Sequence, residues 1–363
     1  MSKKNYRIAV LSGDGIGPEV MNEAKKVLAA IGEKFEIGLE FDEQIVGGAA
    51  IDAVGDALPS ETLQVCEKSD SILFGSVGGE KWNSLPPEKR PEVGALLPLR
   101  KKFDLFANIR PAGVLPMLAS SSPLKPEIIG AGFDFTVVRE LTGDVYFGEK
   151  NRGDDFASDL MIYNKAEVER IARVAFELAK SSKKKVTNVD KSNVLATSQF
   201  WRSVVEEIHT QEFPEIELEH LYIDNATMQI LTRPGDFDVI LAGNLFGDIL
   251  SDEAAQISGS IGLQASASIN AKKFGLYEPM GGSAPDIAGQ GIANPIAQIL
   301  SAAMMLEISF GEKEAAEAIK NAVQRTLEAG LRTGDIFTGA EGEQKVSTTE
   351  MGDEITKNVE RKT

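Results

Sequence analysis

The chain has 363 residues, 42% of them hydrophobic and 26% charged, which is typical of a soluble globular enzyme with one or two domains. A formal net charge of −17 at pH 7 argues against nucleic acid and against an anionic membrane as partners. The chain has one cysteine, Cys66, which excludes an internal disulfide framework and favours the cytoplasm, and its helix-like context predicts a buried packing thiol. Only two histidines are present, so serine–histidine triads and histidine-ligated zinc are poor candidates.

The first part of the chain alternates between strand and helix patterns. Residues 7–11 and 71–75 are short apolar runs typical of buried strands, and residues 18–31 form a helical pattern with Pro18 in the first turn. The strand at 71–75 ends in a glycine-rich turn at 75–79. This alternation predicts an α/β fold with helices covering a largely parallel sheet.

The middle and the end of the chain continue with further elements. A polar, glycine-containing segment at 149–158 predicts a protruding arm, and Ser347 with Glu350 forms a capping box for a terminal helix. We expect strands at 133–138, 145–147, 186–189, 218–223 and 239–241, and helices at 165–180, 197–211, 295–310 and 314–329.

Two glycine clusters are candidate ligand sites. The cluster at 13–17 follows a strand and opens a helix, but Pro18 occupies the place of the third glycine of a dinucleotide fingerprint. We therefore interpret it as a tight turn near a ligand, with a Rossmann phosphate site as the less favoured alternative. The cluster at 281–289 is a better cofactor candidate, because small residues allow close backbone approach. Its Asp286 could bind ribose hydroxyls and would repel a 2′-phosphate by roughly 4 kcal/mol, which favours NAD over NADP.

Three arginines lie in apolar sequence surroundings, namely Arg100, Arg110 and Arg139. A guanidinium does not deprotonate in proteins, so such a context requires an anionic partner. Together the three suit a substrate with two carboxylates, although each alone is also compatible with a structural ion pair.

Three carboxylates are candidate metal ligands. Asp248 and Asp252 would share one face of a helix in apolar surroundings, and Asp224 follows the strand expected at 218–223. A hard divalent cation would relieve the repulsion between Asp248 and Asp252. Lys191 also follows a strand, and Tyr146 offers a phenol that could relay a proton, although a packing tyrosine is an open alternative.

These motifs resemble those of the β-decarboxylating dehydrogenases, the isocitrate/isopropylmalate family. The resemblance covers nearly the whole chain, and its matching stretches are 13–19, 94–100, 139–148, 189–195, 222–229, 244–253 and 278–295. It implies two α/β domains with a mixed, largely parallel twisted sheet that is not a Rossmann fold. It also implies a cofactor-side domain made of residues 1–105 and 259–363, and a central substrate, metal and dimerisation domain at 106–258 with its arm near 149–160.

The resemblance implies an activity and assigns roles to residues. The expected reaction is NAD-dependent oxidative decarboxylation of (2R,3S)-3-isopropylmalate to 4-methyl-2-oxopentanoate and CO2, in leucine biosynthesis. Lys191 and Tyr146 would be catalytic, and Mg²⁺ or Mn²⁺ would bind Asp224, Asp248 and Asp252. A homodimer would share its active sites, with Lys191, Asn193 and Asp224 serving the partner. The implied substrate residues are Leu96, Leu97, Arg100, Arg110, Arg139, Lys191, Asn193 and Asp224. The implied cofactor residues are Gly78, Glu92, Glu278, Gly282, Ser283, Ala284, Asp286, Ile287 and Asn294.

Three other functions fit these residues less well. A sister enzyme acting on tartrate, malate or homoisocitrate would not be expected to carry the apolar pair Leu96 and Leu97. A noncatalytic regulatory subunit would be expected to lack Lys191, Tyr146 or a metal aspartate. A metal-dependent phosphohydrolase would not explain the three arginines together with the cluster at 281–289.

Overall fold

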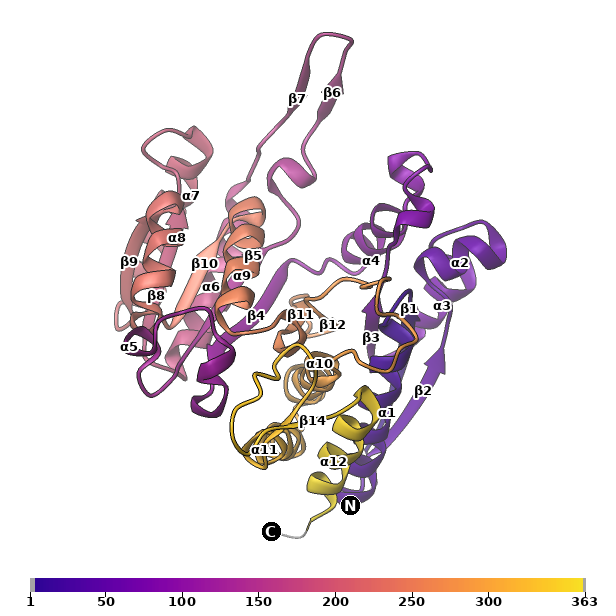
Figure 1. The fold of residues 1–363 in the computed structure, drawn as a ribbon. Coiled ribbons are helices and arrows are strands. Elements are labelled where there is room, and N and C mark those ends of the chain that lie inside the picture. Colours follow the sequence, from indigo (N-terminus) through magenta and orange to yellow (C-terminus); the bar gives the residue numbers. More distant parts are fainter. Residues whose placement is uncertain (1–3, 362–363) are drawn as a thin grey trace. The chain divides into compact units, whose positions relative to one another are not determined.

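The computed structural model describes residues 4–361, and these form two compact units. The first unit contains the described residues up to Phe103 and from Ser260 onward, and the second is Asp104–Gly259. Each unit carries helices packed on a mixed sheet (Figure 1). The predicted α/β class is therefore confirmed, and the arrangement is not that of a Rossmann fold.

The sheet of the first unit has the strand order β2-β1-β3-β12-β11. β1 pairs in parallel with β2 and β3, β3 pairs in parallel with β12, and β12 pairs antiparallel with β11. Every position of β3 is buried, because the strand lies between β1 and β12 and is covered by α1 and α10. The strands are β1 (Asn5–Gly13), β2 (Gly38–Glu43), β3 (Ser71–Ser76), β11 (Ala265–Ile269) and β12 (Gly275–Pro279).

The helices of the first unit pack in layers around α1 and α10, which both contact the sheet. α10 is apolar almost all round and is the most deeply buried of them, whereas α11 and α12 are amphipathic. α11 packs on α10, and α12 packs on α1 and α11. The predicted capping box of Ser347 and Glu350 at the start of α12 is confirmed. The helices are α1 (Gly17–Lys34), α2 (Gly47–Val54), α3 (Ser60–Lys68), α4 (Leu97–Lys102), α10 (Ile296–Ile308), α11 (Lys313–Glu328) and α12 (Thr348–Glu360).

The sheet of the second unit has the strand order β4-β5-β10-β8-β9. β10 is the central strand and pairs in parallel with β5 and β8, β8 pairs in parallel with β9, and β4 pairs antiparallel with β5. Parallel strands present their carboxyl ends at one edge, where the connections to α7, α8 and α9 begin. The strands are β4 (Ala107–Val114), β5 (Phe133–Glu140), β8 (Lys185–Asp190), β9 (Glu217–Tyr222) and β10 (Val239–Ala242).

Helices α6 and α9 both pack on β5, while α7 and α8 pack on β8, so both faces of this sheet are covered. An exposed antiparallel hairpin of β6 (Lys150–Arg152) and β7 (Ala157–Asp159) extends away from this sheet (Figure 1). No described helix in 4–361 is long and apolar enough to span a bilayer. The helices of this unit are α5 (Pro126–Ile129), α6 (Lys165–Lys180), α7 (Ala196–Glu212), α8 (Ile223–Thr232) and α9 (Asn244–Ile257).

One strand prediction was wrong. Residues 145–147 were expected to be extended, but Asp144–Tyr146 is a single 3-10 turn. Asp144 has a φ of 71°, a left-handed conformation that aspartate tolerates better than most residues, and it turns the chain before a strand can form.

Candidate active site

Five of the predicted site residues meet on the second unit. Arg139, near the end of β5, forms an ion pair with Asp248 of α9. The hydroxyl of Tyr146 donates a hydrogen bond of 2.7 Å to the other oxygen of Asp248. Arg110 of β4 places Nη1 at 3.5 Å from both Asp248 and Asp252. The acidic face of α9 is therefore balanced by arginines that come from neighbouring strands.

Close packing of α9 on β5 makes this arrangement possible. A Cβ atom on Gly247 would lie 2.7 Å from the Cγ of Arg139, so only glycine allows the helix to approach the arginine stem. The side-chain oxygen of Asn244 accepts hydrogen bonds from Nε and Nη2 of the same arginine, at 3.0 and 2.7 Å. Arg139 is thus held at both sides of its guanidinium. The Cζ atom of that group lies 5.4 Å from the centroid of the Tyr146 ring.

Desolvation by the surrounding protein affects the titration of this cluster. It raises the pKa of Asp252, although that side chain is largely exposed, and Asp248 adds to that effect while Arg110 opposes it. Burial also raises the pKa of Tyr146, as does the hydrogen bond to Asp248. A divalent cation would favour the ionised carboxylates and would supply the charge that two adjacent acids require.

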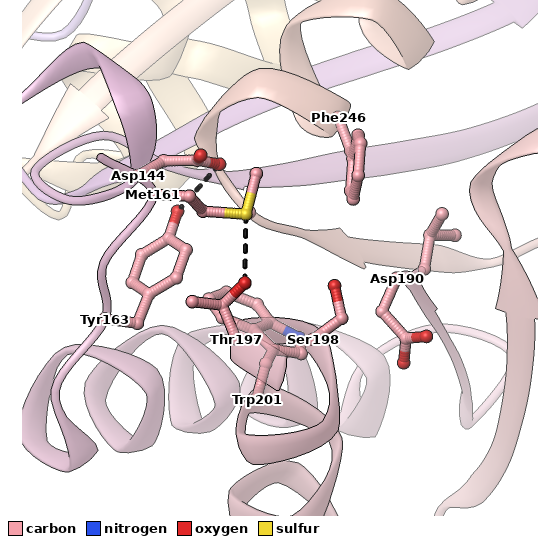
Figure 2. A pocket seen from close by; sticks show the side chains of 10 residues that line it. Asp144, Met161, Tyr163, Asp190, Thr197, Ser198, Trp201 and Phe246 are labelled. Carbon is pink, nitrogen blue, oxygen red and sulfur yellow. Dashed lines mark hydrogen bonds between the residues drawn. The ribbon is translucent and has the colours of Figure 1, made fainter. Parts of the chain in front are cut away.

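The turn that carries Tyr146 is anchored to α9 by Asp144, which the sequence analysis did not single out. Asp144 is buried and accepts hydrogen bonds from the backbone N–H of Val145 at 2.7 Å and of Leu245 at 3.1 Å. The Tyr163 hydroxyl points to the same carboxylate and also accepts a hydrogen bond from the backbone N–H of Asn244 (Figure 2). These contacts satisfy amides in the first turn of α9 that have no partner within the helix.

The pocket drawn in Figure 2 lies beside this anchor. Its volume is about 20 Å³, enough for one water molecule and too small for a substrate. Met161 Sδ accepts a hydrogen bond from Thr197 Oγ1 across it. We therefore assign it a packing role.

Lys191 and Asp224 form a second cluster in the same unit. They follow β8 and β9, neighbouring parallel strands, and they form an ion pair with each other. Asp224 is largely exposed, and its hydrogen bond from Lys191 lowers its pKa. Asn193, two residues after Lys191, is exposed on the same turn.

The turn of Lys191 is held by an ion pair that the sequence analysis missed. The buried carboxylate of Asp190 accepts two hydrogen bonds of 2.8 Å from Arg202 of α7 and one of 2.8 Å from the backbone N–H of Ser192. Bidentate pairs of this kind have a fixed geometry. The Asp-x-Ser pattern at 190–192, directly after a strand, was the available signal, because it is typical of an Asx turn.

The three predicted metal ligands are not brought together within one chain. Across residues 4–361 there is no group of three His, Cys, Asp or Glu side chains close enough to hold a metal ion. Asp248 and Asp252 lie together, whereas Asp224 pairs with Lys191.

Arg100, the third of the predicted substrate arginines, belongs to the first unit. Arg100 of α4 donates a hydrogen bond of 3.0 Å to the buried carboxylate of Glu278. Its Nε is also buried and has no hydrogen-bond partner among the described residues. Leu96 and Leu97 lie one turn before it and are half-buried, where the π-helical turn Glu92–Leu96 runs into α4. Such π-turns are frequent at functional sites.

A cavity of about 350 Å³ opens among loops of the first unit. Four predicted cofactor residues line it, namely Gly282, Ala284, Ile287 and Asn294. Ile16 and Ile261 add apolar surface suited to a flat aromatic ring. Of the other predicted cofactor residues, Asp286 is exposed on the turn between Ala284 and Ile287.

Polar groups of this cavity were missed by the sequence analysis. Asn294 donates a hydrogen bond of 3.0 Å to Asp335, which also lines the cavity. Gln298 is fully buried in its wall, and both amide atoms lack a hydrogen-bond partner within 4–361. Unsatisfied buried polar atoms are costly, so the site fits a ligand with polar edges.

Gly78, Glu92 and Ser283 come together beside the cavity. A Cβ atom on Gly78 would lie 2.0 Å from Oε1 of Glu92, and the hydroxyl of Ser283 donates a hydrogen bond of 2.7 Å to the carbonyl of Gly78. The turn at 13–17 closes the group, because Ile16 N–H donates a hydrogen bond of 2.8 Å to the carbonyl of Ser283. Since that amide is used within the protein, the turn does not form a phosphate cradle of the Rossmann type.

Two α/β units, an arginine–carboxylate–tyrosine cluster and a separate cavity for a flat polar ligand define a two-domain α/β enzyme. A profile of the isocitrate/isopropylmalate dehydrogenase family matches residues 7–355. The chain belongs to this family.

Named relatives and solved structures agree with this membership. The 3-isopropylmalate dehydrogenase of Haemophilus influenzae is 58% identical over 98% of this chain and 100% of its own length. That of Syntrophotalea carbinolica is 56% identical over 97% of this chain and 98% of its own. The crystal structure of isocitrate dehydrogenase from Methylococcus capsulatus has a TM-score of 0.86 and 33% identity, covering 98% of this chain and 100% of that one. A β-decarboxylating dehydrogenase from Thermococcus kodakarensis has a TM-score of 0.78 and 35% identity, covering 98% and 96%.

Proposed function

We propose that the chain is an NAD-dependent 3-isopropylmalate dehydrogenase of leucine biosynthesis that works in the cytoplasm. It would oxidise and decarboxylate (2R,3S)-3-isopropylmalate to 4-methyl-2-oxopentanoate and CO2. The observation that carries this proposal is the cluster of Arg110, Arg139, Tyr146, Asp248 and Asp252, because it combines anion-binding, metal-binding and proton-transfer groups. The names and identities of the relatives point to the same reaction.

The arginines would bind the two carboxylates of the substrate. Arg110 and Arg139 already meet carboxylates of α9, and Arg100 has a buried Nε that needs an acceptor. Leu96 and Leu97 would contact the isopropyl group, since they are half-buried apolar residues one turn from Arg100. This apolar pair is the feature that disfavours malate, tartrate or homoisocitrate as the substrate.

The acids fit Mg²⁺ or Mn²⁺. Mg²⁺ is bound through few carboxylates and keeps several waters, which suits Asp248 and Asp252 with one further acid. We assign that third acid to Asp224 of a second copy, since Asp224 and Asp252 are both well exposed. When bound, the cation would polarise the hydroxyl and carboxylate oxygens of the substrate, and NAD would accept the hydride.

Two side chains would move protons. Lys191 would take the proton of the substrate hydroxyl, and Tyr146 would give a proton to the carbon that loses CO2. The hydroxyl of Tyr146 is protonated at neutral pH, since the ordinary pKa of a tyrosine is 10.0 and burial and Asp248 raise it further. A protonated phenol is the form that can serve as a general acid.

The dinucleotide would occupy the cavity of the first unit. Ile16, Ile261 and Ile287 would contact the adenine ring, and Asn294 and Gln298 would face its polar edges. Asp286 would accept the ribose hydroxyls and disfavour a 2′-phosphate. Glu92, Glu278 and Gly78 would lie on the nicotinamide side.

We further propose a homodimer with shared active sites. Met228 and Leu231 on α8 and Ile249 on α9 are exposed apolar side chains on two helices that pack together. Such surfaces commonly mark an interface. A two-fold interface through α8 and α9 would supply Lys191, Asn193 and Asp224 of one copy to the acids of the other.

Mixing two inactive variants tests this sharing. After subunit exchange between Lys191→Ala and Asp248→Asn dimers, a mixed dimer has one site in which both residues are intact. About a quarter of wild-type activity should return if exchange is statistical and the sites are shared. A site built within one chain would give no recovery.

The reaction itself is tested by NADH formation with 3-isopropylmalate, isocitrate, malate and tartrate in parallel, with and without Mg²⁺. Of the four diacids, we expect only 3-isopropylmalate to support the reduction of NAD to NADH. A chelator should abolish this activity, and added Mg²⁺ or Mn²⁺ should restore it. Full turnover in the presence of excess chelator, or a preference for another diacid, would refute the assignment.

A further inference from the structure

Asp14, in the turn between β1 and α1, is a buried carboxylate without a role in the proposed chemistry. Its Oδ2 accepts hydrogen bonds of 2.8 Å from the backbone N–H groups of Gly48 and Gly78, and its Oδ1 accepts one of 2.7 Å from Ala49. The side chain is only 5% exposed. Burial raises the pKa of Asp14, while the three N–H donors oppose that shift.

These bonds connect loops that are far apart in the sequence. Gly78 belongs to the glycine-rich turn after β3 and packs against Glu92, whereas Gly48 and Ala49 begin α2. The same Asp14 turn continues into Ile16, whose N–H bonds to the carbonyl of Ser283 in the cavity-lining cluster. A Cβ atom on Gly15 would lie 1.9 Å from that carbonyl, so this contact requires glycine.

A carboxylate is the side chain that satisfies this set of donors. Both oxygens accept from N–H groups, so an asparagine of the same size would turn its own NH2 group toward at least one N–H. The resulting donor–donor contact leaves a buried amide without a partner. Replacement of the charge alone should therefore loosen at least one of the attached loops.

We propose that Asp14 is a positioning residue for dinucleotide binding. It holds the turn of Gly78 directly, and through Ile16 it holds Ser283 of the glycine cluster at 281–289, so that both segments keep the conformation that accepts the cofactor. This inference rests on the proposed function only in its choice of cofactor. It predicts that the loops are ordered by Asp14 before any ligand binds, as an example of preorganisation.

The first test uses the unmodified protein. Without ligand, the backbone amides of Gly48, Ala49 and Gly78 should be protected from hydrogen exchange, because each is bonded to a buried carboxylate. Free exchange at Gly78 would overturn the proposal. This result does not depend on which substrate the enzyme oxidises, so it is separable from failure of the proposed function.

The second test compares Asp14→Asn with the wild type by steady-state kinetics and by calorimetric NADH binding. The Kd for NADH and the KM for NAD should rise about tenfold or more, as expected for one unpaired buried amide. The KM for 3-isopropylmalate should change less than the KM for NAD, since two of the three substrate arginines, Arg110 and Arg139, belong to the second unit.

The control is Asp238→Ala in the second unit, because both hydrogen bonds of Asp238 end on one oxygen, which an asparagine could still supply. Asp238 is also buried and accepts hydrogen bonds from Lys185 N–H at 3.1 Å and from the hydroxyl of Ser182 at 2.9 Å. The control variant should lower the melting temperature without changing the Kd for NADH. Equal effects of the two variants on cofactor affinity, or a normal Kd in Asp14→Asn, would reduce Asp14 to a purely structural residue.

Discussion

The hydroxyl of Tyr146 donates a 2.7 Å hydrogen bond to Asp248, a carboxylate that also forms an ion pair with Arg139. One aspartate therefore links the proposed proton donor, the proposed metal site and a substrate arginine. The turn Asp144–Tyr146 is itself anchored to the first turn of α9, since Asp144 accepts a hydrogen bond from the backbone N–H of Leu245.

Tyr146→Phe removes the phenolic proton and leaves the ring against Arg139. We expect kcat to fall by about two to four orders of magnitude, the usual contribution of a general acid. The KM for 3-isopropylmalate should change little. Tyr277→Phe is the control, because Tyr277 is a buried tyrosine bonded to Ser309 in the other unit, and it should retain kcat. A wild-type kcat in Tyr146→Phe would exclude the assigned role.

Lys191→Ala removes the proposed base from a turn that Asp190 and Arg202 still hold. NADH binding should stay near the wild-type value, whereas NAD reduction should be lost. Lys185→Ala, at the opposite end of β8, removes ion pairs with Glu217 and Glu219 and should lower stability only. Normal turnover by Lys191→Ala would refute the base assignment.

Asp286→Asn should narrow the preference for NAD over NADP. The carboxylate is exposed, so water screens its repulsion of a 2′-phosphate, and the ratio of the two kcat/KM values should change about fivefold to tenfold. Glu61→Gln, a neutralised surface acid on α3, provides a control for net charge. An unchanged ratio would remove Asp286 from the specificity site.

Cys66 should be unreactive in the folded protein. Burial raises the pKa of its thiol from 9.0 to about 12, so the reactive thiolate is absent at pH 8. Alkylation with iodoacetamide at pH 8 should be slow until a denaturant is added. Because the unfolded thiol ionises near 9.0 and the folded one does not, this residue should lower the free energy of unfolding as the pH rises above 9. Rapid native alkylation would contradict its burial.

The sequence by itself determined the fold class, the family and most local elements. Hydrophobic periodicity identified α6, and the capping box identified the start of α12. Pro18, in place of a third glycine, correctly argued against a Rossmann phosphate site. These features depend on residues close together in the chain, where spacing limits the possible structures. The strand expected at 145–147 was wrong because one left-handed residue, Asp144, decided the turn.

Only the tertiary structure decided which charges meet. The contacts of Arg139 with Asp248, of Asp190 with Arg202 and of Asp14 with Gly78 join segments on different elements. Composition and spacing do not specify such pairings, because they depend on strand order and on how closely a helix can approach a strand. Within residues 4–361 of one chain, Asp224 pairs with Lys191 and no third acid joins Asp248 and Asp252, so in our proposal a second copy would complete the metal site.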